Sequence, residues 1–270
     1  MRALLLRLVL AAAVAIMLVA ASCYSSVSFN GTQGSLSITN HPDNVSNASA
    51  TGVWSGSDSV SGLRVTALID AGGLATFIRS DGVQFVGQVT TSGNTFAAAV
   101  LGYSNFGTPF GDGSTSGSGT LNGTVMSGST LSATLTFSTA GNTAMDGTWS
   151  LNFQALSNHG SSLAAISGNY RDTASNTVLS VNSDGAMTSQ DPVNHCVLNG
   201  SITTHDGAHD IYEVSYSYGD CSGAAAALNG VEFSGLASLN TGATPVQLTI
   251  AVTGSSAAGA YAQVSSFDGS

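Results

Sequence analysis

The sequence predicts an all-β protein built from two tandem antiparallel barrels of about eight strands each. The first observation is alternation, because segments such as 130–138 place apolar and hydroxyl side chains at every second position. The second is that no convincing helical stripe of ten or more residues follows the N-terminal segment. The third is an internal repeat. A pair of half-open sandwiches made of the same strands is the alternative that these patterns leave open.

The internal repeat has a nearly constant offset of 112 to 116 residues. Gly52-Val53-Trp54 corresponds to Gly168-Asn169-Tyr170, and the strand of Leu131 corresponds to the strand of Val246. Three further glycine pairs are Gly73 with Gly185, Gly87 with Gly200 and Gly119 with Gly235. A constant offset over five landmarks indicates two copies of one domain. We place the first copy at residues 51–156 and the second at 157–270.

Eight strands are expected in each copy, joined by short links that favour sequential hairpins. In the first copy they are expected at 53–57, 63–70, 75–80, 83–91, 95–103, 117–126, 130–138 and 147–154. In the second copy they are expected at 167–172, 177–182, 186–189, 196–204, 211–218, 231–240, 245–253 and 261–267. Six Asp-Gly pairs, such as Asp81-Gly82, are interpreted as the turns between strands rather than as calcium ligands.

Gly52 and Trp54 open the first expected strand, and Gly147-Thr148-Trp149 is a second Gly-x-Trp. In this motif each copy resembles the small lipocalin-like and avidin-like barrels. The resemblance implies a closed meander whose interior is filled by side chains or holds one small ligand. Most aromatic residues are interpreted as barrel core rather than as a ligand cage, while Ala97-Ala98-Ala99 leaves room beside them. These core aromatics are Phe77, Phe85, Phe96, Phe137, Tyr212, Tyr216 and Phe233.

Residues 1–22 have the pattern of a secretory signal peptide, with an early positive charge, an apolar core and small residues at the end. The following Val19-Ala20-Ala21-Ser22-Cys23 resembles the lipobox of bacterial lipoproteins. That resemblance implies cleavage before Cys23 and acylation of Cys23, including palmitate. Because Tyr24 rather than Asp follows the cysteine, it also implies export to the outer membrane of a Gram-negative cell. Residues 23–50 are expected to be the lipidated N-terminus and a flexible tether.

The charge of the mature chain excludes several partners. After cleavage at Cys23 three arginines and no lysine stand against fifteen Asp and Glu, which gives a net charge of −12. Binding of nucleic acid requires clustered Lys and Arg, so no nucleic-acid partner is expected. The expected membrane attachment is through the lipid anchor alone.

Two cysteines remain after Cys23 is assigned to lipid, and we expect Cys196 and Cys221 to form a disulfide. Cys196 begins one strand-like run and Cys221 ends the next, with a turn at 205–208 between them. Their register is off by a residue or two, and a bulge at Gly219 would correct it. A free redox-active pair is the alternative, but the Cys-x-x-Cys spacing is missing.

The second copy also resembles a widespread type of uncharacterised bacterial lipoprotein. The matching residues are Cys196 with Gly200, Tyr212 with Val214 and Cys221, and Phe233 with Gly235, Leu236 and Ala237. The first copy lacks both cysteines, so a role that depends on them does not transfer to it. The resemblance implies membership of a group without an assigned activity.

The candidate metal ligands are few. His205 and His209 flank a turn, with His195 expected nearby along the paired strand. We interpret this as a solvated turn, so no metal or cofactor is predicted, and His205 and His209 stay weak candidates. Catalysis is not expected either, because there is no Gly-x-Ser-x-Gly and the chain has only two Glu.

Three functions follow from these observations. The first is a non-enzymatic, lipid-anchored envelope lipoprotein that acts as an interaction or structural module on the outer membrane, with another envelope protein as partner. The second is a lipocalin-like carrier, in which one barrel encloses a small apolar ligand. The third is a transmembrane β-barrel of about sixteen strands, which the short strands and the two Trp disfavour.

Overall fold

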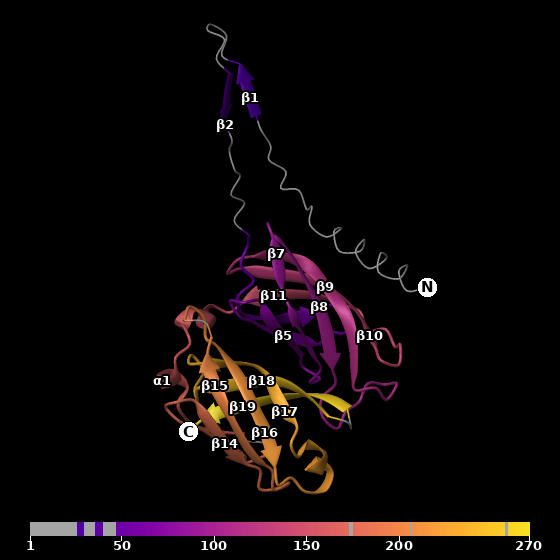
Figure 1. Ribbon diagram of the computed structural model, residues 1–270, viewed down its shortest axis with the longest axis vertical. Coiled ribbons are helices and arrows are strands. Elements are labelled where there is room, and N and C mark those ends of the chain that lie inside the picture. Colours follow the sequence, from indigo (N-terminus) through magenta and orange to yellow (C-terminus); the bar gives the residue numbers. More distant parts are fainter. Residues whose placement is uncertain (1–25, 30–35, 40–46, 173–174, 206, 257–258) are drawn as a thin grey trace, which may run out of the picture. The chain divides into compact units, whose positions relative to one another are not determined.

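The computed structural model describes residues 26–29, 36–39, 47–172, 175–205, 207–256 and 259–270 (Figure 1). In the N-terminal unit, β1 (Ser26–Phe29) pairs antiparallel with β2 (Leu36–Thr39). This strand pair lies in the segment where the sequence predicts a tether. Cys23 and the expected signal peptide lie outside the described residues. No helix within the described ranges has both the length and the apolar character needed to cross a membrane.

The first barrel comprises the strands from β3 to β11 (Figure 1). Each strand pairs with the next along the chain, except that β6 pairs with β8 instead of β7, and β3 also pairs with β11. These two pairings close the sheet, and the short β7 is a side branch on β8. The strands are β3 (Gly52–Asp58), β4 (Arg64–Ile69), β5 (Leu74–Arg79), β6 (Gln84–Gln88), β7 (Thr90–Ser92), β8 (Thr95–Tyr103), β9 (Ser116–Met126), β10 (Thr130–Thr139) and β11 (Gly147–Phe153).

Large aromatic side chains fill the interior of the first barrel. Phe85 packs against Phe137 and Trp149, with ring centroids 5.1 and 5.7 Å apart. All three side chains are buried, as is Trp54. Burial alternates strictly along β8 and β10, so Ala98 faces the core while Ala97 and Ala99 are exposed. Only one of the three alanines therefore faces the interior, because a strand turns successive side chains to opposite faces.

The second barrel contains eight strands and closes where β12 pairs with β19. Short helical turns η1 (Ala155–His159) and α1 (Leu163–Ile166) precede it, and η2 (Gly223–Leu228) lies between β16 and β17. Its strands are β12 (Gly168–Arg171), β13 (Val178–Val181), β14 (Ala186–Gln190), β15 (Val197–Thr204), β16 (Ile211–Gly219), β17 (Glu232–Asn240), β18 (Gln247–Ser256) and β19 (Gly259–Gly269).

The predicted all-β class, antiparallel meander and duplicated barrel architecture are confirmed. Each of the sixteen expected strands overlaps a strand of the structure. The sandwich alternative is wrong, because both sheets close. A single barrel of sixteen strands is also wrong, because the closing pairs join β6 to β8 and β12 to β19 within each copy.

The two copies share local details that follow from the repeat. Gly73 and Gly185 have the same positive φ of 87°, a conformation that favours glycine. Trp54 donates its indole N–H to the carbonyl of the residue four positions earlier, at 2.8 Å. Tyr170, the equivalent residue, donates its hydroxyl to the carbonyl four positions earlier, also at 2.8 Å. The Trp-to-Tyr difference between the copies therefore keeps one hydrogen bond.

The last residues of the predicted tether belong to the first barrel. The Ala48 N–H donates to the carbonyl of Gly93 at 2.8 Å, and Asn47 Oδ1 accepts from the Gly93 N–H at 2.9 Å. Ala50 is buried and provides the carbonyl that Trp54 binds. The tether was expected to continue to residue 50 because this polar stretch has no periodicity of its own.

Direct backbone contacts join the two barrels. The Ala262 N–H donates to the carbonyl of Ser104 at 2.8 Å, and the Phe106 N–H donates to the carbonyl of Ala262 at 3.1 Å. Gln84 Nε2 donates to the carbonyl of Gln263 at 2.8 Å. An apolar cluster accompanies these bonds. It contains Leu68 and Ile78 from the first barrel and Ile211, Leu236 and Ala251 from the second.

Candidate functional site

A cavity of about 260 Å³ lies at one end of the second barrel. Its apolar wall includes Leu179, Leu198, Ile250 and Phe267. These side chains come from β13, β15, β18 and β19 and point inward by the alternation of each strand. The first barrel places two tryptophans and several phenylalanines at its inward positions, whereas the second barrel has no tryptophan and contains a cavity among its inward side chains.

Three polar side chains that line the cavity are hydrogen-bonded to one another. Tyr216 and Tyr218 both donate their hydroxyls to Gln263 Oε1, at 2.7 and 3.2 Å. Burial raises the pKa of both tyrosines, so they stay protonated as donors. Tyr216 also stacks on Phe233, with centroids 5.5 Å apart. Because both hydroxyls use Oε1, the amide N–H groups of Gln263 are left to donate elsewhere.

Another polar atom that lines the cavity is buried without compensation. The hydroxyl of Ser189 has no hydrogen-bond partner among the described residues. Buried polar atoms normally have a partner, which is a residue, a water molecule or a ligand. Ser189 therefore marks a point where a bound molecule would gain a hydrogen bond.

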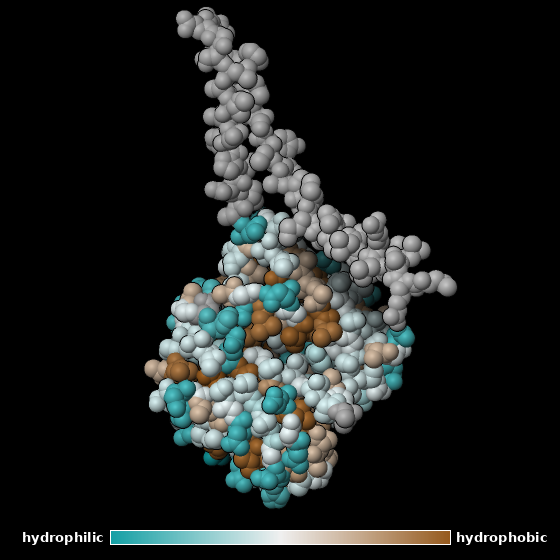
Figure 2. All heavy atoms as spheres, viewed as in Figure 1, coloured by the Kyte–Doolittle hydropathy of each residue, from teal (hydrophilic) through white to brown (hydrophobic). Residues whose placement is uncertain are grey.

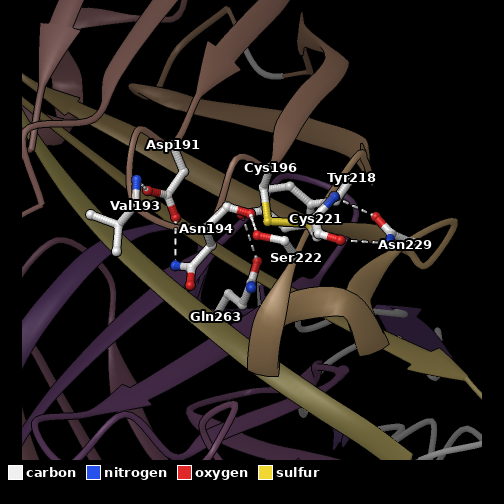
Figure 3. Close-up of a disulfide and its surroundings, with 9 residues drawn as sticks. All are labelled: Asp191, Val193, Asn194, Cys196, Tyr218, Cys221, Ser222, Asn229 and Gln263. Carbon is white, nitrogen blue, oxygen red and sulfur yellow. Dashed lines mark hydrogen bonds between the residues drawn. A yellow bond between two sulfur atoms is a disulfide. The ribbon is translucent and has the colours of Figure 1, made fainter.

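The disulfide between Cys196 and Cys221 lies beside this cavity and anchors residues 222–229, which we call the roof of the cavity (Figure 3). Asn229 Oδ1 accepts from the Cys221 N–H at 2.8 Å, and its Nδ2 donates to the Cys221 carbonyl at 3.0 Å. Ser222 donates to the Asn194 carbonyl through both its N–H and its hydroxyl. The segment between Ser222 and Asn229 includes η2, whose Ala225 and Leu228 line the cavity.

The predicted disulfide is confirmed, and so is its place across the hairpin of β15 and β16. Val197 pairs with Gly219, so Cys196 would face residue 220 in an unbroken ladder. The additional residue is Asp220, whose φ of 58° turns the chain before Cys221. The bulge therefore lies one residue later than the predicted position at Gly219.

The first barrel contributes one side chain to this site. Phe106 follows β8 and lines the cavity of the second barrel. Its ring packs on Tyr261 of β19 with centroids 5.2 Å apart. β12 and β19 pair at only two positions, so much of the outer edge of β19 is available to the segment around Phe106. The wall of the cavity is therefore completed from the other barrel.

Carboxylates give the cavity rim its charge. Asp172 and Asp191 are part of the lining, and none of the described lining residues is Arg, Lys or His. Burial favours a higher pKa for Asp191, but hydrogen bonds from Asn194 and Val193 outweigh it and lower the pKa. Asp191 is therefore ionised at neutral pH. The rim favours neutral or cationic ligands over anions.

One face of the outer surface consists mainly of residues of intermediate hydropathy. Figure 2 shows a face that is largely pale, with scattered hydrophilic and hydrophobic patches. This agrees with a composition of only 7% charged residues and 33 glycines.

The histidine candidates are separated by the fold. His205 contacts Asp70 and Glu213, and His209 is not part of that group. The expectation that His195 lies nearby is wrong, because β15 runs between them and an eight-residue strand spans about 26 Å. Sequence reasoning missed Asp70, which comes from the first barrel.

Three of the Asp-Gly pairs have the expected turn conformation. Gly82, Gly113 and Gly185 have φ values of 86°, 81° and 87°. All seven aromatic residues assigned to the core are buried. One of them, Tyr216, also lines the cavity, so the distinction between core and ligand contact does not hold for it.

Comparisons with known proteins identify no relatives. No protein-family profile matches the chain, and it has no significant match among curated proteins or solved structures.

Proposed function

We propose that this protein is a non-enzymatic, lipid-anchored envelope protein whose second barrel binds a small molecule. The observation that carries the proposal is the contrast between the two interiors. The first is filled by Trp54, Phe85, Phe137 and Trp149, whereas the second contains the cavity. Of the functions expected from the sequence, this contrast favours a carrier over a purely structural module.

The cavity limits the size and polarity of the ligand. At about 260 Å³ it is slightly smaller than the usual range for drug-sized ligands, which begins near 300 Å³. A molecule of one or two rings, or a short branched chain, matches this space. Gln263 and Ser189 supply polar contacts, while Leu179, Leu198 and Phe267 supply apolar surface. The acidic rim disfavours carboxylates and phosphates.

The anchoring part of the proposal rests on the sequence alone. The lipobox-like segment that ends at Cys23 supports acylation and attachment to the outer membrane. A ligand-binding barrel held at a membrane surface would collect or present its ligand there.

Native mass spectrometry of the mature chain, extracted in mild detergent from its own host, tests both parts. We expect acyl chains at Cys23 and a reproducible small non-covalent mass. The cavity variant is Ser265→Phe, which places a ring in the space, because Ser265 lines it. The matched control is Ser266→Phe, because Ser266 is exposed on the same strand.

Loss of the small mass in Ser265→Phe, but not in Ser266→Phe, would support ligand binding in the second barrel. A parent chain without a small mass, carrying another protein instead, would contradict the carrier function and favour the interaction module. A mass without acyl chains would contradict the anchor.

A further inference from the structure

A cluster of three possible metal ligands lies where the two barrels meet, outside the lining of the cavity. Asp70 directly follows β4 of the first barrel, His205 directly follows β15, and Glu213 lies on β16. His205 Nε2 lies 3.4 Å from Asp70 Oδ2, and His205 Nδ1 lies 3.0 Å from Glu213 Oε1. Asp70 and Glu213 are 143 residues apart in the chain, so only the packing of the barrels brings the three residues together.

The carboxylate of Asp70 has an unusual environment. Its side chain is 2% exposed, and Oδ1 accepts a hydrogen bond from the Leu74 N–H at 2.8 Å. The other oxygen, Oδ2, faces the imidazole of His205 at a distance longer than a normal hydrogen bond. A buried carboxylate is stabilised by hydrogen bonds, by a cation or by protonation, and a metal ion at Oδ2 would supply the cation.

We infer that Asp70, His205 and Glu213 form a binding site for a divalent transition-metal ion. An imidazole together with carboxylates suits zinc and related first-row ions better than it suits calcium or magnesium. A dication would also balance the two carboxylates. The inference does not depend on ligand binding in the cavity.

The spacing of Asp70 Oδ2 and His205 Nε2, 3.4 Å, is close to what zinc requires. One ligand atom from each residue lies within 4.8 Å of the other two. Tetrahedral zinc with bonds of about 2.1 Å holds its ligand atoms about 3.5 Å apart. Glu213 contacts the other ring nitrogen, Nδ1, and its side chain is 45% exposed, so it would reach an ion on Nε2 by changing its rotamer.

Space is available beside the ligand nitrogen. An imidazole binds one ion through one nitrogen, and Nε2 is the nitrogen that faces the buried carboxylate. Gly72 lies against this point, where a Cβ atom would be 3.3 Å from Asp70 Oδ1 and 3.5 Å from His205 Nε2. Because Gly72 has no side chain, the nitrogen keeps an approach for the ion and for a water ligand.

Isothermal titration of Zn²⁺ into the chelator-treated, full-length mature chain tests the inference. We expect one ion per chain in the parent. His205→Ala should weaken binding at least tenfold, because it removes the one nitrogen ligand. His209→Ala is the matched control, because it removes a histidine of the same turn region that is not one of the three clustered residues, and it should bind as the parent does.

Asp70→Asn supplies a second variant, which keeps the size of the side chain and removes its charge. It should also bind Zn²⁺ at least tenfold more weakly. Thermal unfolding in EDTA shows whether each variant is folded, and Zn²⁺ should raise the unfolding temperature of the parent and of His209→Ala only. A parent that binds no ion, or equal affinity in parent, His205→Ala and Asp70→Asn, would overturn the inference.

Discussion

Buried polar side chains in this protein differ in whether they stabilise or destabilise the folded state. Tyr170 is buried with its hydroxyl bonded to a backbone carbonyl, and Trp54 does the same in the first barrel. Asp210 is buried at 2% exposure, and neither carboxyl oxygen has a partner at normal hydrogen-bond geometry among the described residues. Burial raises the pKa of Asp210 to about 6, against opposing effects of Tyr212 and His159. This carboxyl group should therefore make stability depend on pH.

Asp210→Asn should remove that dependence. The pKa of Asp210 rises from 3.8 when unfolded to about 6 when folded, so the folded state binds its proton more tightly. In the parent, the stabilisation that comes from this tighter proton binding is fully present below pH 4 and is lost as the pH rises through 6. The variant should be more stable than the parent at pH 8, by roughly 2 to 3 kcal/mol, and nearly equal to it at pH 4.

Urea unfolding at the two pH values measures this difference. Ser189→Ala is a suitable control, because it changes another buried polar group that does not titrate. The same gain for Asp210→Asn at pH 4 and pH 8 would contradict the assigned pKa.

At the scale of elements, the roof of the second barrel depends on one covalent bond. The disulfide fixes the end of β16, and η2 follows it directly. The first barrel has no cysteine and builds its closed end from aromatic packing instead, as in Phe110 against Phe137 at 5.9 Å. The two copies therefore use different means for the same end of the barrel.

The double substitution Cys196→Ala/Cys221→Ala should lower the free energy of unfolding by about 3 kcal/mol, the value expected for a loop of this length. Because η2 would also lose its anchor, the small mass bound by the parent should be lost in native mass spectrometry. Unchanged stability and an unchanged bound mass would show that Asn229 alone holds the roof.

The elements were also the most predictable part of the molecule. Alternation along stretches such as 130–138 determines which face of a strand is buried, and this is a local property of the chain. The disulfide was predictable for the same reason, because its cysteines lie on one hairpin. The closed barrel could be expected only as one of two solutions, since closure depends on pairing between strands that are distant in sequence.

At the scale of the whole molecule, the candidate site escapes sequence analysis because it depends on contacts between the copies. Phe106 lines the cavity of the other barrel, and Gln84 binds the backbone of Gln263. Neither contact has a signal in local periodicity. The pairing of His205 with Asp70, rather than with His209, has the same cause. A polar or aromatic side chain in a turn gives no indication of what will pack on it.

These contacts should make the barrels unfold together. The variant Gln84→Met/Phe106→Ala removes the hydrogen bonds of Gln84 to the second barrel and the Phe106 ring, while the first barrel keeps its own core. We expect one calorimetric transition for the parent and two for the variant, because the shared interface is weakened. Met126→Ala, at an exposed position of β9, is the control and should keep one transition. Two transitions in the parent would contradict this coupling.

The bridge between the segment Ser104–Phe106 and Ala262 also bears on how such a protein can be recombined. The second barrel, moved alone into another chain, would carry an unprotected edge along β19 and an opening where Phe106 had been. Exposed strand edges promote association with other chains, so a transplanted copy would need a new neighbour to cover that edge. The two barrels are therefore not independent modules, because the segment around Phe106 covers part of β19 and completes the cavity of the second barrel.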